Sequence, residues 1–433
     1  MKILADSRTF QNAGSYSIST EAGFFFPSAS ISNGALNVID GVIDSVSPKP
    51  LFDKVFLFEN ACIIPRFVNT HTHLEASNLR EPISCGAGLL SEWITGLLAF
   101  RQSAAYNPEN AIVTGANELY ETGTSGIGDV VLPSFFFNEN ADVLQNVKKI
   151  ACSLPTGIKT RCFLELIALN DAMAETRLNE AKRFLDAVFQ CAEYGKTFMA
   201  GLSPHAPYTV SPKLLEGVVE LSRAYRVPVT IHLAETEEEL QLLQTHSGPF
   251  CEMMRRFDVD VNWNQTLLGK RPIDYLAALA DCERVVIAHG NYLDDAEIRF
   301  LAKRRDNMSV AFCPVPHKFF GRRRYPLRQM FDCGVRVTLG VDGRASWSYI
   351  SDDVNACSDS ATPQNFSIAN PLSMLKTVNV LLRDYPEISI NEILETATYH
   401  GNVALGFTDI SAKSCCDTFS PGNAADFLVI RTN

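Results

Sequence analysis

The middle of the chain alternates between short apolar runs and longer segments in which apolar residues recur every three to four positions. Short runs rich in Val, Ile and Phe predict β-strands, and the longer period predicts amphipathic helices. Eight strands are predicted, over residues 68–73, 125–130, 161–166, 198–203, 227–233, 284–288, 308–313 and 335–341. Strands that alternate with helices in this way predict an α/β fold, a (β/α)8 TIM-like barrel with a closed parallel sheet.

The segments between these strands carry the helices that would surround the barrel. Helices are predicted over residues 179–194, 212–224, 237–256 and 294–303, with closing helices over 371–383 and 389–400. Residues 343–370 show no such period and are rich in Ser, Asp and Asn. We expect this segment to form a long loop over the mouth of the barrel.

The two ends of the chain have a different pattern. Residues 35–39 and 42–46 are short apolar runs joined by Asp40-Gly41, a dipeptide typical of tight β-hairpin turns. A further strand is predicted over residues 422–430, after a Pro-Gly turn. We therefore expect a small β-sandwich domain formed by both termini, residues 1–62 and 402–433, and a barrel domain over residues 63–401.

Composition narrows the function classes. The 433 residues are 46% hydrophobic and 20% charged, an ordinary balance for a globular protein. The net charge of −11 argues against nucleic-acid binding, and no apolar run approaches the roughly 20 residues of a membrane span. The 12 cysteines contain no C-x-x-C pair, which fits reduced thiols. We expect a cytoplasmic protein that binds a small molecule, without a nucleic-acid or membrane partner.

Six of the eight histidines fall at or just after the carboxyl ends of predicted strands. In a parallel barrel these ends meet at one mouth, where catalytic residues gather. An isolated His-x-His could be two unrelated polar residues on an exposed strand, but this gathering favours a site. His246 and His400 fall in helical segments, and we expect structural roles for them. The residues at strand ends are His71, His73, His205, His232, His289 and His317, together with Asp342 after the last strand.

The first strand ends in His71-Thr72-His73, and residues i and i+2 of a strand point to the same side. Two imidazoles can therefore face one metal ion. With His232 and Asp342 they form a donor set for one divalent metal ion, Zn or Fe, which ligand type alone does not separate. Such a metal lowers the pKa of a bound water from about 15.7 to about 7.

Other polar groups beside these ligands suit the proton transfers of hydrolysis. Asp342 can accept the proton of the water, and His289 can orient the water or stabilise a tetrahedral centre. Glu235 lies three residues after His232, where it can carry protons to a ring nitrogen and to a departing amine. We expect Glu235, His289 and Asp342 to be the catalytic residues.

Six motifs occur in order along the chain: NTHTHLE, SPHAPYT, IHLAET, AHG, CPxxH and LGxDxxAS. Together they resemble the amidohydrolase superfamily, in the branch of cytosine, guanine and S-adenosylhomocysteine deaminases and triazine hydrolases. The HTHLE form, Trp93 in SEWITGLLAFR and the GTSGIGD segment are most similar to the aminodeoxyfutalosine deaminases. Arg66 and Gly343 depart from the pattern, which usually has Gly and Ser at these positions.

The resemblance implies the same metal ligands and catalytic residues, and it assigns His205, His317 and Trp93 to substrate binding. Relatives with two metals use a lysine at the end of the fourth strand to bridge the ions. Here that end is Ser203-Pro204-His205, and Lys196 precedes the strand, so a single metal is expected. The resemblance also suggests a homo-oligomer.

The implied function is a metal-dependent hydrolase that deaminates an aminated purine nucleoside or related heterocycle and releases ammonia by attack of a metal-bound hydroxide. One alternative is removal of chloride or an alkylamine from a similar ring, and another is a non-catalytic barrel scaffold. Glu235 favours amine loss, because ammonia and ring nitrogens need protons. A scaffold would be expected to have lost ligands, and none is missing from the motifs.

Arginines near the last strands bear on the charge of the substrate. Arg344 follows Asp342 by two residues, and three consecutive arginines occupy positions 322–324. The triple arginine fits a solvated surface turn, whereas Arg344 has little room to point away from the site. We expect Arg344 to bind an anionic group of the substrate, such as a carboxylate.

Overall fold

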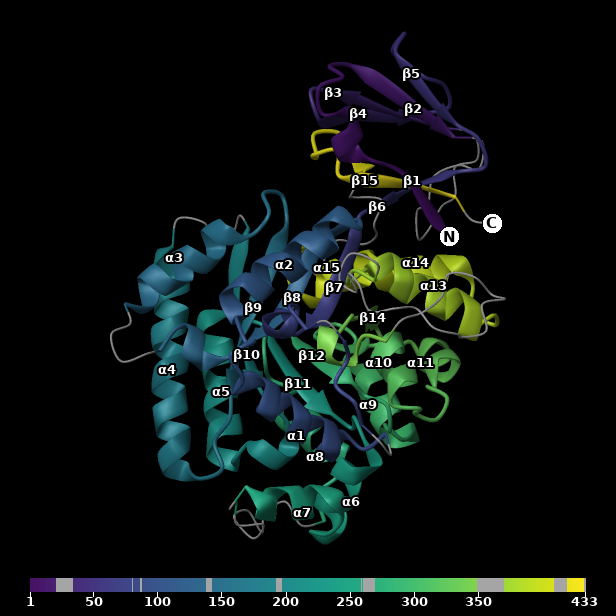
Figure 1. The fold of residues 1–433 in the computed structure, drawn as a ribbon. Coiled ribbons are helices and arrows are strands. Elements are labelled where there is room, and N and C mark those ends of the chain that lie inside the picture. Colours follow the sequence, from purple (N-terminus) through teal and green to yellow (C-terminus); the bar gives the residue numbers. More distant parts are fainter. Residues whose placement is uncertain are drawn as a thin grey trace.

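The computed structural model describes residues 1–20, 34–79, 81–85, 88–137, 142–191, 197–257, 259, 269–348, 370–408 and 419–431. A large barrel carries a smaller pair of β-sheets at one end, and both chain termini lie near the junction of the two parts (Figure 1). Within the described ranges, no helix is long and apolar enough to cross a membrane. Most of the loop expected over residues 343–370 lies outside the described residues.

Eight parallel strands form the barrel sheet, and each neighbours the next along the chain. Their apolar residues lie against surrounding helices, so the strands are buried on both faces, as parallel strands usually are. All eight strands predicted from the sequence are confirmed, with end points that differ by a few residues at most. They are β7 (Phe67–Thr72), β8 (Thr124–Val131), β9 (Lys159–Leu166), β10 (Phe198–Pro204), β11 (Val229–Leu233), β12 (Val285–His289), β13 (Met308–Phe312) and β14 (Val337–Leu339).

The first and last strands meet and close the barrel. The backbone N–H of Asp342 donates to the carbonyl oxygen of His71 at 3.0 Å, and the N–H of His73 donates to the carbonyl oxygen of Asp342 at 2.8 Å. Deeper in the seam, the hydroxyls of Thr70 and Thr338 are hydrogen-bonded at 2.7 Å. The expected barrel fold is therefore confirmed, and its closure places residues from opposite ends of the sequence side by side.

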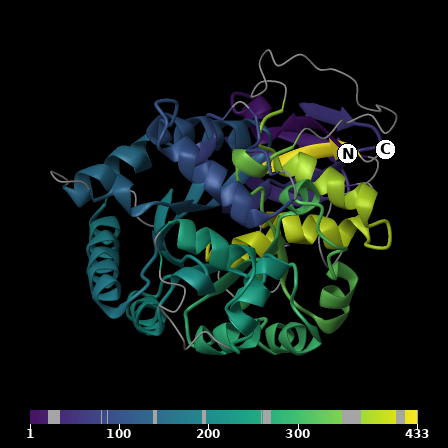
Figure 2. The same cartoon turned by 60° about the horizontal axis from the view of Figure 1, so that its bottom comes forward.

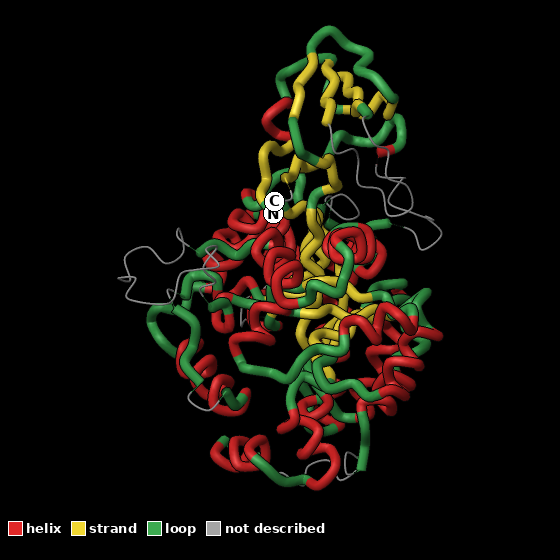
Figure 3. The backbone as a smooth tube through the Cα atoms, turned by 90° about the vertical axis from the view of Figure 1, so that its right-hand side faces the viewer, coloured by secondary structure: helices red, strands yellow, loops and turns green. Residues whose placement is uncertain are grey.

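Helices enclose the strands on all sides of the barrel (Figures 2 and 3). The helices α6 and α7 lie at the end of the molecule opposite to the small β-sheets (Figure 1). The α-helices are α1 (Leu90–Arg101), α2 (Pro108–Glu121), α3 (Val143–Ser153), α4 (Asp171–Gln190), α5 (Pro212–Tyr225), α6 (Glu237–Thr245), α7 (Pro249–Arg256), α8 (Pro272–Ala278), α9 (Asp295–Lys303), α10 (Pro314–Phe319), α11 (Leu327–Cys333), α13 (Met374–Asp384), α14 (Ile390–Ala397) and α15 (Tyr399–Ala404). Short 3-10 helices are η1 (Ser7–Phe10), η2 (Leu74–Ala76), η3 (Pro133–Phe135), η4 (Pro207–Thr209) and η6 (Arg344–Ser346).

The single helix expected over residues 237–256 is wrong, because the chain turns between α6 and α7. His246 adopts the left-handed conformation with φ 49°, and Gly248 has φ 92°. Pro249 then begins α7, where a proline without an N–H is tolerated. The apolar period continues across the turn, so periodicity alone did not separate the two helices.

The small β-part consists of two sheets. One is antiparallel and joins both ends of the chain in the order β1 (Lys2–Asp6), β15 (Phe427–Arg431) and β6 (Cys62–Pro65). The other has the order β4 (Val42–Ser47), β3 (Ala35–Ile39), β2 (Tyr16–Thr20) and β5 (Val55–Phe58). The hairpin expected at Asp40-Gly41 is confirmed, and both turn residues have positive φ, 48° and 79°. Because β6 continues to Pro65 and α15 spans residue 402, the domain limits at 62 and 402 stay a prediction.

Arg66, one of the two departures from the resemblance, connects the barrel to the small sheets. Its Nη1 lies 2.6 Å from Oδ2 of Asp6 in β1, and its Nη2 donates to the carbonyl oxygen of Tyr120 at 2.6 Å. The guanidinium also lies 4.7 Å from the centre of the Tyr120 ring. An arginine at this position therefore does not disturb the start of β7; it ties that start to β1 and α2.

Candidate active site

The carboxyl ends of β7, β11 and β12 and the residues just after β14 bring histidines and a carboxylate into one cluster. The Nε2 atoms of His71 and His73 lie 3.6 and 3.8 Å from Oδ1 of Asp342. The Nε2 atoms of His73 and His232 are 3.1 Å apart. The ring of His289 lies 5.2 Å from that of His71. The residues predicted as metal ligands are therefore neighbours, although their role as ligands stays a prediction.

Backbone conformation at these strand ends is unusual. His289 and Asp342 have φ of 67° and 60°, and Ala234, beside Glu235, has φ of 53°. A non-glycine residue in this left-handed region costs about 1–3 kcal/mol and persists only where its surroundings fix it. Here the strain aims side chains into the mouth of the barrel, and the barrel closure at Asp342 holds it in place.

The donors in this cluster fit a divalent metal ion. Both ring nitrogens of His71 are buried and have no hydrogen-bond partner among the described residues. The Nδ1 atom of His232 lies 3.0 Å from the carbonyl oxygen of His205. A proton on Nδ1 donates to that oxygen and leaves the lone pair of Nε2 free for the cluster. Three imidazoles and one carboxylate form a donor set that suits Zn or Fe.

Charge states in the cluster agree with this donor set. Burial, assisted by neighbouring imidazoles, lowers the pKa of His73 and of His232 well below the ordinary value. Burial alone would raise the pKa of Asp342, but the nearby imidazoles of His71, His289 and His73 hold that pKa below the usual range. The hydroxyl of Ser346 also donates to Oδ2 of Asp342 at 3.1 Å. His73 and His232 are thus neutral and the aspartate is ionised at neutral pH.

Glu235 lies at the mouth after β11, with its Oε1 3.7 Å from Nε2 of His289. Burial and the nearby charge of Asp342 raise the pKa of Glu235 well above the ordinary value. Its backbone is fixed on both sides: the N–H donates to Glu239 at 2.8 Å, and the carbonyl oxygen accepts from Asn291 at 3.0 Å. A carboxyl group that holds a proton in this position can act as a general acid.

A cavity of about 320 Å³ opens beside the cluster. Its polar side includes His73, His205, His232, Glu235, His289 and Asp342. Its apolar lining includes Leu90, Trp93, Ile94, Leu97, Leu98, Met253 and Met254 from α1 and α7. The indole N–H of Trp93 donates to the carbonyl oxygen of Ala345 at 3.0 Å, which fixes the ring as part of the wall. Trp93 and His205 therefore line the cavity, as their predicted substrate contacts require, and those contacts stay a prediction.

The profile of the Amidohydrolase family matches residues 62–432. The chain belongs to the amidohydrolase family. Among similar sequences, a 5′-deoxyadenosine deaminase of Methanococcus vannielii is 27% identical over 86% of this chain and 75% of its own length. A 5-methylthioadenosine/S-adenosylhomocysteine deaminase of Pyrococcus furiosus is 27% identical over 71% of this chain and 65% of its own length.

Solved structures share the fold of this amidohydrolase over nearly its whole length. The aminofutalosine deaminase of Helicobacter pylori, in complex with methylthio-coformycin, has a TM-score of 0.71 and 19% identity, and covers 96% of this chain and 92% of its own. An adenosine deaminase of Xanthomonas campestris with bound zinc has a TM-score of 0.63 and 19% identity, with coverage of 96% and 85%. At this identity the likeness concerns the fold.

Arg344 does not face the cavity of the amidohydrolase, so the expectation of an anion contact there is wrong. Its side chain is 0% exposed and forms an ion pair with Glu118 of α2. Its Nη1 donates to the carbonyl oxygen of Asn370 at 2.6 Å. The neighbours Gly343 and Ala345 line the cavity instead. A buried guanidinium needs a paired carboxylate, and Glu118 lies 226 residues away in the sequence.

His317 and the triple arginine also lie outside the cavity lining. The Nδ1 atom of His317 lies 3.1 Å from Oδ1 of Asn291, and its ring is 5.3 Å from that of Phe312. The structure therefore does not bring His317 into contact with the cavity, and its substrate role stays a prediction without support from its position. Arg323 and Arg324 are exposed, as a surface turn requires.

Three charged residues of the cavity wall were not identified from the sequence: Glu75, Arg101 and Glu165. The Nη2 of Arg101, the last residue of α1, lies 2.6 Å from Oε1 of Glu75. The hydroxyl of Tyr106 donates to the other oxygen of Glu75. Glu165 is the penultimate residue of β9 and was within a predicted strand, so the strand-end rule could have found it. Nothing local in the sequence marks Arg101.

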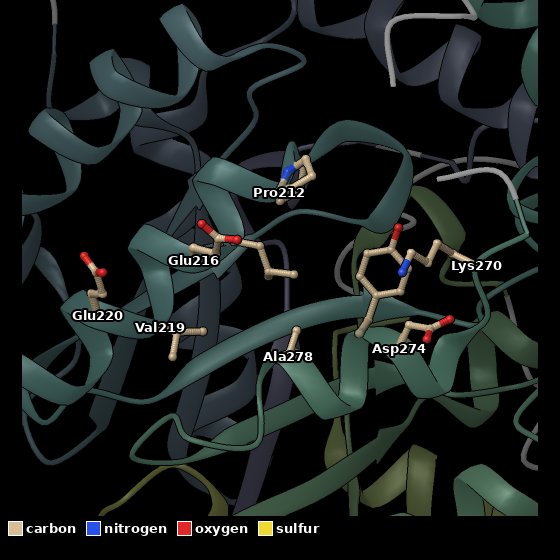
Figure 4. A pocket seen from close by; sticks show the side chains of 10 residues that line it. Pro212, Glu216, Val219, Glu220, Lys270, Asp274 and Ala278 are labelled. Carbon is tan, nitrogen blue, oxygen red and sulfur yellow. The ribbon is translucent and has the colours of Figure 1, made fainter. Parts of the chain in front are cut away.

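Another hollow, of about 660 Å³, lies outside the barrel between α5 and α8 (Figure 4). Glu216, Glu220, Lys270 and Asp274 border it together with apolar side chains such as Val219. None of the described residues that line it is a histidine or cysteine. We therefore place the chemistry of the protein at the barrel mouth.

Proposed function

We propose that this amidohydrolase is a metal-dependent deaminase of an aminated purine nucleoside or related heterocycle. The observation that carries the proposal is the position of Glu235, 3.7 Å from His289 at the edge of the histidine cluster, with a raised pKa. Its small-molecule substrate would occupy the adjoining cavity of about 320 Å³, a size in the range of known ligand pockets. The names of the similar sequences, deaminases of 5′-deoxyadenosine and 5-methylthioadenosine, support the same class of substrate. A homo-oligomer stays a prediction.

One divalent ion, zinc or iron, would be held by His71, His73, His232 and Asp342. When bound, such an ion lowers the pKa of water from about 15.7 to about 7 and so supplies hydroxide at neutral pH. A second ion would need a bridging lysine at the end of β10, where this chain has Ser203-Pro204-His205. Lys196 lies outside the described residues.

The chain's own residues move the protons. Asp342, ionised in this site, accepts a proton as water adds to the ring carbon that bears the amine. Protonated Glu235 delivers its proton to the adjacent ring nitrogen, which takes up the electron pair of the former C=N bond. The proton held by Asp342 then passes to the amine, the carbon–nitrogen bond breaks and ammonia leaves. The hydroxyl proton of the tetrahedral centre returns to Glu235 as the new C=O bond forms, which restores both carboxyl groups. One water is consumed for each ammonia released.

His289 and His205 orient the substrate and the water. Burial lowers the pKa of His289 to about 3, so its ring stays neutral and can hydrogen-bond to the tetrahedral centre. His205 is held by a contact of 2.8 Å between its Nδ1 and the hydroxyl of Thr209. The apolar wall at α1 and α7 keeps bulk water away from the reacting groups.

Removal of chloride or an alkylamine from a similar ring is the alternative chemistry. Chloride leaves as an anion and needs no proton, whereas an amine does. The raised pKa of Glu235 therefore favours loss of an amine over loss of chloride, and the choice between ammonia and an alkylamine is left to the measurement. Ammonia release would be measured with adenosine, 5′-deoxyadenosine and 5′-methylthioadenosine, and with chlorinated and alkylaminated triazines as competitors. Turnover of a triazine, without ammonia release from any of the nucleosides, would replace the deaminase proposal with the alternative.

A further inference from the structure

The charged side chains of the cavity wall are unevenly paired. Among the described residues that line the cavity, Arg101 is the only lysine or arginine. Its Nε and Nη2 atoms both donate to Oε1 of Glu75, at 3.2 and 2.6 Å. This pairing occupies the one cationic side chain of the wall, so a carboxylate on a ligand would have to compete with Glu75 for it.

Glu165 is a second carboxylate of the cavity wall, and Arg101 forms its ion pair with Glu75 instead. It lies near the end of β9, is 4% exposed and lines the cavity. Within the part of the chain that the structure describes, its carboxylate has no hydrogen-bond or ion-pair partner. The charge of Glu165 raises the pKa of Arg101, His205 and Tyr208, so its carboxylate lies near the end of α1 and the end of β10. A buried carboxylate is stable only with donors around it, and the free space beside Glu165 is the cavity.

We propose that Glu165 recognises hydrogen-bond donors of the substrate, hydroxyl or ammonium groups, and that it selects against substrates that carry a carboxylate. This inference rests on the proposed function and narrows its substrate class to neutral or cationic nucleosides. Glu75, Arg101 and Glu165 together carry a formal charge of −1 in this part of the cavity lining. A second carboxylate placed there would be repelled, whereas a donor would satisfy Glu165.

Neither Arg322 nor Arg344 forms an ion pair with Glu165 within the described part of the chain. Arg344 is committed to Glu118 and points away from the cavity. Arg322 borders a separate hollow together with His317 and Lys318, and its charge acts on Glu235 and His289 at the histidine cluster. Apolar side chains such as Leu97 also line the cavity, so they accommodate the uncharged part of a substituent. The cavity is thus shaped for a nucleoside with an apolar or amine-bearing substituent.

The test uses three adenosine derivatives that share the purine and differ at the 5′ position: 5′-amino-5′-deoxyadenosine, 5′-deoxyadenosine and adenosine-5′-carboxylate. Both kcat/KM and the equilibrium Kd are measured for the metal-loaded full chain. The first two should be preferred to the carboxylate by about 10-fold or more. Glu165→Gln should raise KM for the amine by about 10- to 100-fold, the effect of losing a charged hydrogen bond, with a smaller change in kcat.

Two further variants keep the test sharp. Glu165→Asp retains the charge and should retain the order of preference, so it separates charge from folding defects. Glu216→Gln makes the same chemical change on an exposed position of α5 and should leave all constants unchanged. Thermal unfolding of each variant verifies that the chain is folded before the constants are compared.

The outcomes separate this inference from the proposed function. Ammonia release with the carboxylate as the best substrate, or with an unchanged KM in Glu165→Gln, overturns the role of Glu165 and leaves the deaminase standing. Preferential binding of the amine without ammonia release supports Glu165 and overturns the deaminase. Binding of none of the three compounds overturns both.

Discussion

The carbonyl oxygen of His205 accepts two hydrogen bonds from His232, one from its backbone N–H at 2.9 Å and one from its ring Nδ1 at 3.0 Å. The backbone of one strand end therefore fixes the ring of the next. Because this contact uses a main-chain atom, it does not depend on the His205 side chain. The imidazole of His205 is left to face the cavity.

This relationship predicts different effects for two histidine variants. His232→Ala should lose bound metal, because it removes a ligand. His205→Ala should keep close to one metal per chain, because the backbone carbonyl that orients His232 remains. Its KM should rise, because the imidazole that faces the cavity is lost. Metal analysis of the purified variants, after reloading with zinc or iron, measures both. Loss of metal in His205→Ala, or two metals per active wild-type chain, would contradict the assigned ligand set.

Glu235→Gln should keep the metal and lose turnover. Glutamine has nearly the same shape but cannot donate the carboxyl proton, and such general acid–base steps contribute about 10²- to 10⁴-fold. Metal content and kcat would be measured on the same preparation. A variant with near-normal kcat would show that another group supplies the proton.

Arg344→Met should act on stability and leave the KM of the best substrate nearly unchanged. The substitution leaves the partly buried carboxylate of Glu118 without its cation, and breaking a buried pair typically costs about 3–5 kcal/mol. Urea unfolding measures the loss. Arg324→Met breaks an exposed pair with Glu387, separated by 2.6 Å, and provides the control, which should lose far less stability because solvent screens the pair. A large rise in KM without loss of stability would restore a substrate role for Arg344.

His400 should make stability depend on pH. Its ring is buried, with Nδ1 2.9 Å from the carbonyl oxygen of Val337, and burial lowers its pKa from 6.5 to about 3. Between these values the unfolded chain binds a proton that the folded chain does not, so stability falls as pH falls from about 6.5 toward about 3. In His400→Gln the slope of unfolding free energy against pH should be smaller by up to about 1.4 kcal/mol per pH unit. Parallel curves for variant and wild type would refute the assignment.

The sequence predicted the barrel and its histidine cluster because both follow from local rules. Strand periodicity located β7 to β14, and the carboxyl ends of parallel strands must meet at one mouth. His71, His232 and Asp342 therefore had to be neighbours once the barrel closed. Even the unexpected Arg66 did not affect this outcome, because its partners lie outside the cluster.

Side-chain direction in the loops was not predictable in the same way. Arg344 could turn toward the cavity or toward α2, and the choice was decided by Glu118, a partner distant in sequence. Arg101 reaches the cavity only because α1 lies across the barrel mouth, a tertiary arrangement with no local signal. Ser247-Gly248-Pro249 is a turn signal between α6 and α7. The apolar period continues on both sides of it, so the sequence pattern predicted one helix instead of two.

The most direct test of the central claim is deamination in isotopically labelled water. The metal-loaded protein would be incubated with 5′-deoxyadenosine in ¹⁸O-water, and ammonia and the purine product would both be quantified. The account predicts one ammonia per product and one ¹⁸O atom on the ring carbon that carried the amine. Glu235→Gln should form neither at a comparable rate. Absence of ammonia across the adenosine derivatives, or a product that carries no label, would contradict a hydrolytic deaminase.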